Sequence, residues 1–258
     1  TVKDAYDAME LGVNQYLLNQ KEVDLTSRDI ETVKENIEWI KKNVLDLLPT
    51  QTKRTDEQMQ YQQFSTPPTI AYLVNWLAKV DKNDTMLEPS AGIGGLATFA
   101  KINGAKVVVN ELSDRRLNVL KNVGFDEYYS ENGEQLDNIL PDSVKPTVVE
   151  MNPPFSSTER MKGKNNTKNA TLHIQQALNR LEDGGRLVAL VGQGMSDNAP
   201  TFKNWWKEIK SKYNVRANVG LGRSDFVKYG TGFGTQIFVI DKTGPTEGET
   251  ITGSLNSL

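Results

Sequence analysis

Predicted strands and helices alternate along most of this chain, and this alternation limits the folds open to it. Strand-like apolar runs lie at 85–88, 106–110, 127–130, 147–150, 186–191, 215–219 and 235–241. Helical patterns lie at 66–76, 96–103, 114–122 and 171–181, and around Trp205 and Trp206. Such alternation predicts an α/β fold with a doubly wound, mostly parallel sheet and helices on both faces. We expect the last two strands to form an antiparallel end.

The first 62 residues precede this alternation and have a helical pattern. Apolar residues of the second predicted helix recur at three- and four-residue spacing, at Ile30, Val33, Ile37, Ile40, Val44 and Leu47. Thr26 or Ser27 is its predicted N-cap. We therefore divide the chain into a helical N-terminal extension and linker (1–62), an α/β domain (63–242) and a flexible tail rich in Gly, Thr and Ser (243–258). Because the chain begins at Thr1, we expect it to be a piece of a larger protein.

Composition excludes several kinds of chemistry. The chain has no cysteine, which rules out disulfides, thiolate nucleophiles and attack on carbon 5 of cytosine through a covalent cysteine adduct. The single histidine, His173, lies in a predicted helix, where packing is expected, and we predict no metal site. A net charge of -3 predicts no broad nucleic-acid-binding surface, so any such contact must be local. No apolar run has membrane-spanning length, and we expect a cytoplasmic protein without membrane contact.

A tetrapeptide, Asn152-Pro153-Pro154-Phe155, follows the strand predicted at 147–150. Neither proline has an N–H to donate to a β-ladder, so the chain must leave the sheet in a rigid loop. Such a loop presents a side-chain amide and proline carbonyls as hydrogen-bond acceptors, beside an aromatic ring. This arrangement suits a planar amino group, although an isolated Asn-Pro-Pro can also be an ordinary turn.

A Gly-rich turn, from Leu87 to Gly95, follows the first predicted strand. Ligands of open α/β sheets bind at such turns, beyond the carboxyl ends of the strands. Glu88 at the strand end would repel a pyrophosphate and suits a cationic or amine-bearing ligand. Glu111, at the end of the second strand, is placed to take both hydroxyls of a ribose. Together these residues predict S-adenosylmethionine as the cofactor.

The order of these motifs resembles that of the gamma-class adenine-N6 DNA methyltransferases. The resemblance covers residues 63–242 and rests on Gln63-Phe64-Ser65-Thr66-Pro67, Glu88-Pro89-Ser90-Ala91-Gly92-Ile93-Gly94, Asn110-Glu111 and Asn152-Pro153-Pro154-Phe155. It implies a Rossmann-like methyltransferase domain that binds S-adenosylmethionine. The cofactor contacts that it implies are Phe64, Thr66, Glu88, Pro89, Ala91, Gly92, Gly94, Glu111 and Leu112, with Glu134 near the cofactor adenine. The usual Gly-Asp pair of the family is Gly133-Glu134 here.

Independently of the family, the loop chemistry suits an exocyclic adenine nitrogen. The lone pair of this nitrogen is delocalised into the ring. Two acceptors, the Asn152 side-chain oxygen and the Pro153 carbonyl, would bind its hydrogens and favour a pyramidal nitrogen. The methyl group then passes to N6 directly, without a covalent enzyme intermediate. Pro154 keeps the loop rigid, and Phe155 would stack on an adenine flipped out of the DNA.

Two further segments carry predictions about the nucleic acid. Arg160, Lys162, Lys164 and Lys168 lie in the polar loop after Phe155 and are candidate phosphate contacts, or else part of a solvated loop. A tight turn is predicted at 230–235, where Phe233 would approach the target base. Trp205 and Trp206 are expected to pack rather than to stack on bases.

Other activities fit parts of the same pattern. Enzymes that methylate protein glutamine, and some RNA methyltransferases, also have Asn-Pro-Pro-aromatic loops, and a catalytically idle binding module is a third reading. The segment 63–67 and the basic loop favour DNA as the partner. Members of the family usually have a target-recognition domain after the last catalytic strand, whereas this sequence has a short Gly-, Thr- and Ser-rich segment after residue 242. We therefore expect the methylase part of a larger protein with further, helicase-like domains.

Overall fold

The computed structural model describes residues 1–52, 65–154, 169–230, 232, 234–256 and 258. Its helices are α1 (Val2–Asn19), α2 (Ile30–Asn43), α4 (Pro68–Ala78), α5 (Gly95–Ile102), α6 (Asp114–Leu120), α7 (Leu136–Ile139), α8 (Asn169–Arg180) and α9 (Lys203–Lys212). Its strands are β1 (Thr85–Glu88), β2 (Lys106–Asn110), β3 (Glu127–Tyr129), β4 (Val148–Met151), β5 (Arg186–Gly192), β6 (Asn214–Leu221), β7 (Thr235–Asp241) and β8 (Ile251–Ser254).

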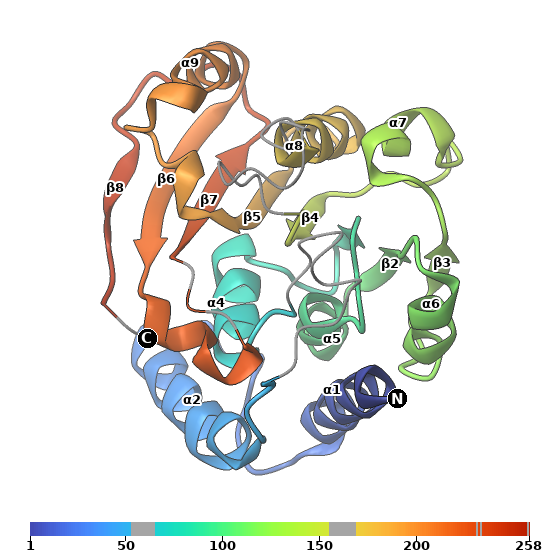
Figure 1. The fold of residues 1–258 in the computed structure, drawn as a ribbon. Coiled ribbons are helices and arrows are strands. Elements are labelled where there is room, and N and C mark those ends of the chain that lie inside the picture. Colours follow the sequence, from blue (N-terminus) through green and yellow to red (C-terminus); the bar gives the residue numbers. More distant parts are fainter. Residues whose placement is uncertain (53–64, 155–168, 231, 233, 257) are drawn as a thin grey trace.

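The strands form one sheet in the order β3-β2-β1-β4-β5-β7-β6-β8 (Figure 1). Strands β1 to β5 pair in parallel, whereas β7 is antiparallel to both β5 and β6. The predicted α/β class, the mostly parallel sheet and its antiparallel end are therefore confirmed. The chain order reverses at β1, which lies between β2 and β4, and ligands of open α/β sheets bind at such a switch point.

Two apolar clusters lie on opposite faces of the sheet. The first joins α4, α5 and α6 to the side chains of alternate strand residues, such as Val107 and Val109. The second lies under α7, α8 and α9 and includes Val149 and Trp206. Alternate residues of β4 enter different clusters, because successive side chains of a strand point to opposite faces. The buried strands thus fix which face each strand-end residue occupies.

Helices α1 and α2 pack on the first of these faces. Helix α1 contacts α5 and α6, and α2 contacts α4. Leu17, Val33 and Ile40 are almost fully buried in the first cluster, so the N-terminal extension shares a core with the α/β domain. The predicted boundary at residues 62 and 63 lies outside the described residues and stays a prediction.

The N-cap predicted for α2 is wrong. Helix α2 begins after Asp29, whose carboxylate accepts from the Thr32 backbone N–H at 3.0 Å. Thr26 is engaged elsewhere, because its hydroxyl and its backbone N–H both donate to the Asp24 carboxylate. Thr26, Ser27 and Asp29 are all residue types that cap helices, and Asp29, which directly precedes the first apolar residue of the helix, is the one that does so here.

The tail at 243–258 also differs from the flexible segment expected from its composition. Within it, β8 pairs in parallel with β6 at the edge of the sheet. The side chains of β8 are exposed, so backbone hydrogen bonding to an open strand edge, rather than burial, accounts for its position. Between β6 and β7 a 3-10 helix at Arg223–Tyr229 replaces a simple hairpin, and Phe233 lies outside the described residues.

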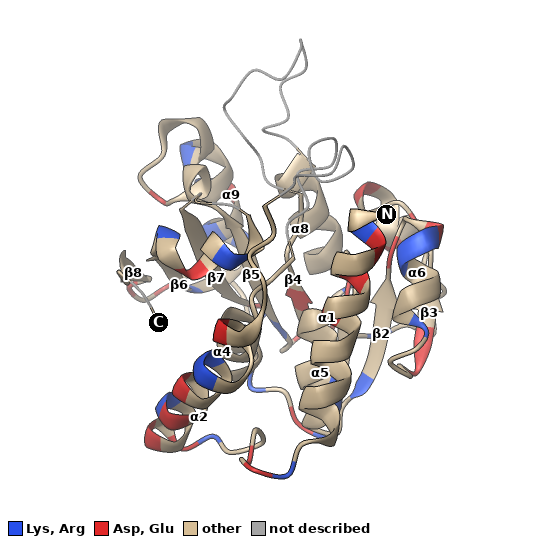
Figure 2. Ribbon diagram, turned by 60° about the horizontal axis from the view of Figure 1, so that its bottom comes forward, with Lys and Arg blue, Asp and Glu red and all other residues tan. Residues whose placement is uncertain are grey.

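Charges of both signs, from Lys and Glu, are interspersed along α2 (Figure 2). The residues concerned include Glu31, Lys34, Glu35, Glu38 and Lys41. Among the described residues, no helix is long and apolar enough to cross a membrane.

Trp206 anchors α9 to the sheet, as the sequence predicts for a packing residue. Its ring meets Phe238 edge-on at 4.5 Å, and its Nε1 donates to the Met195 carbonyl at 2.9 Å. Trp206→Phe should lower the free energy of unfolding by about 2–3 kcal/mol, because it removes buried volume and leaves that carbonyl without its donor. Urea denaturation measures this. The matched change Trp205→Phe, at a less buried ring, should cost about 1 kcal/mol or less, and equal losses would contradict this account.

Candidate functional site

The Gly-rich turn joins β1 to α5 at the switch point of the sheet. Gly92 and Gly94 have φ angles of +57° and +85°, in the left-handed region that favours glycine. A Cβ at position 94 would lie 2.8 Å from Leu120 Cδ1 and 2.9 Å from Phe125 Cε2. Glycine at 94 therefore lets the turn pack closely against the end of α6 and the segment that follows it.

Glu88, at the end of β1, turns back onto α5. Its carboxylate accepts from the Ala97 backbone N–H at 2.8 Å, in the first turn of that helix. Burial raises the pKa of Glu88 well above its ordinary value, and the nearby Glu150 and Glu111 raise it further. The helix N-terminus, where nucleotide-binding sheets hold a phosphate, is thus occupied by an acidic side chain.

Asn110 and Glu111 connect the ends of three strands. The Asn110 side chain donates to the carbonyls of Pro89 and Glu131 and accepts from the Glu131 backbone N–H. Glu111 is buried, and its two oxygens accept from the backbone N–H groups of Gly92 at 2.7 Å and Ser113 at 3.0 Å. Burial raises its pKa, although these backbone donors and Arg116 lower it. The carboxylate is therefore held beside the turn by the backbone.

The diproline loop leaves the sheet at the end of β4. Asn152 follows Met151, the last residue of β4, and its Nδ2 donates to Thr66 Oγ1 at 3.0 Å. Thr66 lies just before α4, so this bond joins the loop to the N-terminal end of that helix. It also fixes the orientation of the amide, and the side-chain oxygen is the atom of Asn152 that could accept from a substrate amino group. Pro153 is buried and Pro154 is half-buried.

A cleft lies between these segments. Its empty volume, which includes the space open to solvent at its mouth, is about 630 Å³. Of the predicted cofactor contacts, Thr66, Glu88, Ala91 and Gly92 line it, and Asn152 lines it as well. One cleft therefore brings together the turn after β1, the segment before α4 and the loop after β4.

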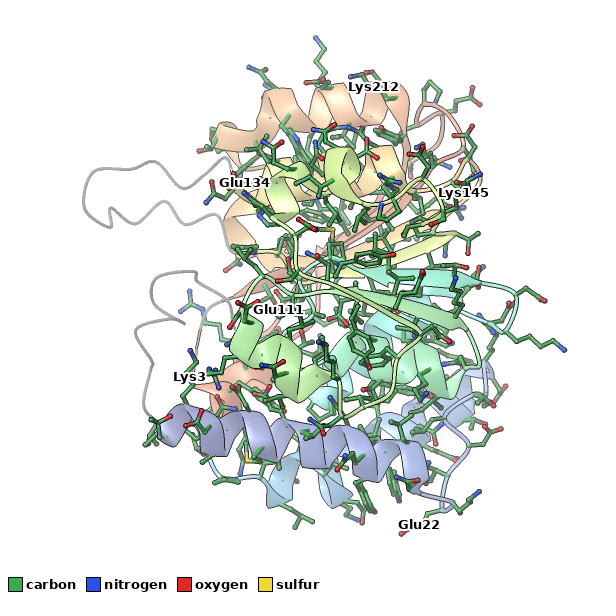
Figure 3. The ribbon with its side chains drawn as sticks, turned by 90° about the vertical axis from the view of Figure 1, so that its right-hand side faces the viewer. Lys3, Glu22, Glu111, Glu134, Lys145 and Lys212 are labelled. Atoms are coloured by element: carbon green, nitrogen blue, oxygen red, sulfur yellow. The ribbon has the colours of Figure 1, made fainter. Side chains whose placement is uncertain are left out.

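Other predicted residues lie beside or away from this cleft. Glu111 borders it through its bond to Gly92, whereas Pro89 and Gly94 shape the turn without lining the cleft. Leu112 is exposed. Glu134 lies in a 3-10 turn at Gly133–Gln135, on the same side of the molecule as Glu111 (Figure 3). The remaining predicted residues, Phe64, Phe155, Arg160, Lys162, Lys164 and Lys168, lie outside the described residues.

His173 packs beneath this 3-10 turn. A Cβ at Gly133 would lie 2.5 Å from the imidazole Cε1, so the close approach requires glycine there. Burial lowers the pKa of His173 to about 4 and keeps the ring neutral. Its packing role agrees with the sequence-based expectation. No group of His, Asp and Glu among the described residues is arranged to hold a metal ion.

The sequence did not indicate several residues that line the cleft. Glu10, Val13, Asn14 and Leu17 come from α1, Arg116 from α6 and Tyr229 from the segment before β7. The helical pattern of α1 identifies a buried face but not its partner. Arg116 is 7% exposed in the structure, and the sequence gives no signal that separates it from the neighbouring Arg115.

Glu150 lies in β4, two residues before Asn152, and is fully buried. Its carboxylate accepts from Asn75 Nδ2 at 3.2 Å, while its Oε1 is buried with no hydrogen-bond partner. The pairing of Leu87 with Val149 sets Glu150 next to Glu88 on the adjoining strand. Burial raises the pKa of Glu150 to about 8. At neutral pH Glu150 therefore keeps a proton that an exposed glutamate would lose, and it lies beside a second buried carboxyl group.

Solved structures share this fold, although no protein-family model and no curated protein sequence matches the chain. A modification subunit assigned to a type I restriction enzyme of Vibrio vulnificus YJ016 has a TM-score of 0.57 and 15% identity, over 88% of this chain. This chain spans 55% of that subunit, or about half its length. A Listeria monocytogenes protein assigned to the class I S-adenosylmethionine-dependent methyltransferases has a TM-score of 0.58 and 17% identity, over 96% of this chain and 86% of its own.

A third structure, assigned as an RNA methyltransferase of Pyrococcus horikoshii, has a TM-score of 0.57 and 16% identity. The match covers 83% of this chain and 100% of that one. At these identities the similarity concerns the fold, which is a Rossmann-like α/β sheet of the methyltransferase type with added N-terminal helices.

The buried pair of carboxyl groups should make stability depend on pH. The folded state keeps a proton on Glu150 up to about pH 8, whereas the ordinary pKa is 4.5. Unfolding between these values releases that proton, so the free energy of unfolding should fall as pH rises from about 5 to 8. Glu150→Gln should reduce this decline by about 1 kcal/mol per pH unit.

Urea denaturation at several pH values measures the decline. Glu127→Gln, at a partly exposed carboxylate on β3, is the matched control and should keep the wild-type slope. An unchanged slope in the Glu150→Gln variant would contradict the account of the buried pair.

Proposed function

We propose that this chain is a methyltransferase domain that uses S-adenosylmethionine and methylates the exocyclic N6 of adenine in DNA. The observation that carries the proposal is that Asn152 and the Gly-rich turn open into one cleft. The cleft thus combines a turn suited to a cofactor with an amide suited to an amino group. The fold shared with proteins assigned as methyltransferases supports the same conclusion.

The charges of the cleft favour a cationic cofactor. Glu88 occupies a backbone N–H of the first turn of α5, and a pyrophosphate there would meet its carboxyl group. Glu10 also lines the cleft, and Glu111 borders it. Burial raises the pKa of all three carboxyl groups, because desolvation disfavours their charged forms. A bound cation would stabilise the charged forms and so offset this cost of desolvation. The sulfonium and ammonium groups of S-adenosylmethionine supply such charge.

Glu111 would hold the ribose hydroxyls, with Gly92 and Ala91 against the cofactor. In its present geometry each carboxylate oxygen already accepts a backbone N–H. A carboxylate has about four acceptor positions, so two ribose hydroxyls can be added without displacing these donors. The backbone bonds would hold the carboxylate in place for the ligand.

The loop after β4 would act on the substrate amine. When bound, S-adenosylmethionine supplies an electrophilic methyl group on a sulfonium. The Asn152 side-chain oxygen and the Pro153 carbonyl would accept the two N6 hydrogens and direct the nitrogen lone pair out of the ring plane. An N6 nitrogen held in this way would be able to accept the methyl group from the sulfonium, which would leave as the neutral thioether, and would then lose one proton to solvent. Thr66 holds the Asn152 amide in orientation for this step.

Two other substrates pose the same chemical problem. RNA adenine and the planar amide of protein glutamine would present their amino groups to the loop in the same way. The similarity to a modification subunit of a restriction enzyme favours DNA, whereas that to a protein assigned as an RNA methyltransferase favours RNA. We favour DNA because residues 63–67 precede the turn as in the family that the sequence resembles. The chain spans about half of the modification subunit, so we further propose that sequence recognition, and any helicase-like domain, lies elsewhere in a larger protein.

Asn152→Ala should abolish methyl transfer while leaving cofactor binding within about threefold of wild type, because the amide acts on the amine and not on the cofactor. Removing one such preorganised group typically costs 10²–10³ in rate, and we expect a loss of about that size or more. Transfer of tritium from labelled S-adenosylmethionine to unmethylated DNA measures it, with N6-methyladenine identified after digestion. Asn118→Ala, at an exposed asparagine on α6, is the matched control.

The same assay separates the alternatives. Transfer to RNA or to a protein, but not to DNA, would replace the substrate class. Cofactor binding without any transfer would favour an idle binding module. An Asn152→Ala variant with wild-type turnover would refute the role of the loop.

A further inference from the structure

One wall of the cleft comes from α1, outside the α/β sheet. Glu10, Val13, Asn14 and Leu17 are four residues of α1 that line it. They lie at three- and four-residue spacing, which places them on one helix face. The N-terminal extension thus closes the side of the cleft that faces the Gly-rich turn.

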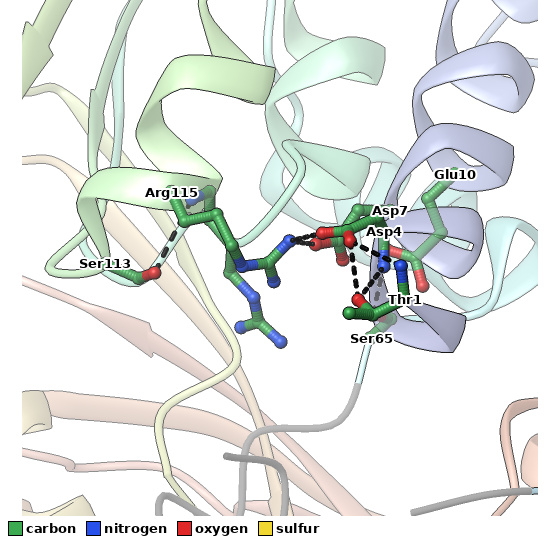
Figure 4. A network of polar contacts seen from close by, with 8 residues as sticks. Thr1, Asp4, Asp7, Glu10, Ser65, Ser113 and Arg115 are labelled. Carbon is green, nitrogen blue, oxygen red and sulfur yellow. Dashed lines mark hydrogen bonds and ion pairs between the residues drawn. The ribbon is translucent and has the colours of Figure 1, made fainter. Parts of the chain in front are cut away.

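Several contacts hold α1 in this position. The buried Asn14 Nδ2 donates to the carbonyl of Ile93, within the Gly-rich turn, at 2.8 Å. Leu17 is 2% exposed in the core. Arg115 of α6 forms ion pairs with Asp7 at 2.5 Å and Asp4 at 3.1 Å (Figure 4). Because these contacts reach both the turn and α6, the position of α1 is tied to the cofactor side of the sheet.

Glu10 points from this wall to the segment before α4. Its Oε2 accepts from Ser65 Oγ at 2.9 Å and its Oε1 from Gln51 Nε2 at 3.2 Å. Both partners are neutral, and among the described residues Glu10 forms no ion pair. Burial raises its pKa, and the proximity of Arg116 lowers it only in part. A desolvated carboxylate with neutral partners is costly, and a cation supplied by a ligand would offset that cost.

The position of Glu10 indicates which part of a ligand it meets. Its partner Ser65 is next to Thr66, which binds Asn152, so Glu10 lies near the end of the cleft where the methyl group would be transferred. The amino-acid end of S-adenosylmethionine is attached to the same sulfur as that methyl group. Arg116 lines the same cleft. Together they offer a negative and a positive group, as an amino-acid zwitterion requires.

We propose that Glu10 binds the α-ammonium group of the amino-acid end of the cofactor, so that α1 is part of the cofactor site. This inference rests on the proposed function. It assigns to the N-terminal extension a contact that the sheet alone does not supply. It also implies that cofactor binding stabilises the docked position of α1.

Two ligands that differ only beyond the sulfur test the proposal. S-adenosylhomocysteine has the amino-acid end, and 5′-methylthioadenosine lacks it. With Glu10→Gln, the Kd of S-adenosylhomocysteine should rise at least about tenfold, because a charge-assisted bond is lost. The Kd of 5′-methylthioadenosine should stay within about twofold. Glu31→Gln, at an exposed carboxylate on α2 paired with Lys34, should change neither value.

Isothermal titration calorimetry on the full chain gives these constants, with thermal unfolding as the check that each variant is folded. Equal binding of S-adenosylhomocysteine by wild type and Glu10→Gln would overturn the inference while leaving the proposed function intact. Equal weakening of both ligands would also overturn it, because Glu10 would then only shape the cleft. A wild-type chain that binds neither S-adenosylmethionine nor these two ligands would refute the proposed function itself.

Discussion

Pro153 and Pro154 lack the N–H groups that would continue the ladder of β4. Strand β4 therefore ends at Met151, while its neighbour β5 pairs with β7 as far as Gly192. The pairing of β4 with β1 is shorter than its pairing with β5 and ends at Val149, so the sheet opens between β1 and β4 at its switch point. Asn152 occupies this opening, and the Gly-rich turn after β1 forms its other side. The cleft therefore forms because the two prolines end β4 and the Gly-rich turn leads the chain out of the sheet after β1.

The cleft is also shaped by unusual electrostatics. Glu10 and Glu88 line it, Glu150 is buried beside Glu88, and Glu111 borders it through its bond to Gly92. Burial raises the pKa of all four carboxyl groups, because desolvating their charged forms costs free energy. Functional sites often carry such a cost, and here a cationic ligand would recover part of it. Arg116 is the buried cation that lines the cleft, and it gives the site a partner for a ligand carboxylate.

Much of the sheet was predictable because its signals are local. The bounds predicted for β1, β2 and β7 match the structure, since each is a run of apolar residues that ends at a change of composition. Strand β8 was not predictable: Ile251-Thr252-Gly253-Ser254 buries no side chain and is held by its backbone. The N-cap predicted for α2 was wrong because Thr26, Ser27 and Asp29 are all residue types that cap helices. Thr26 instead donates to the Asp24 carboxylate, and Asp29 caps the helix.

The residues of the candidate site also differ in whether a local sequence pattern indicates them. The sequence pointed to Glu88, Glu111 and Asn152 because each lies at or just after the end of a predicted strand, and parallel strands end at one edge of a sheet. Glu10 and Asn14 could not be found, because a helical pattern shows which face is buried but not what it contacts. The bond between Asn152 and Thr66 is likewise a long-range contact, across 86 positions of sequence.

The central claim is that the diproline loop and the Gly-rich turn serve one bound cofactor. A crystal structure of the chain with S-adenosylhomocysteine tests it most directly. The account predicts the ribose hydroxyls on Glu111, the adenosine against Gly92, and the sulfur facing the Asn152 side chain. A ligand bound on the face of the sheet covered by α8 and α9, or with its sulfur directed away from Asn152, would contradict it.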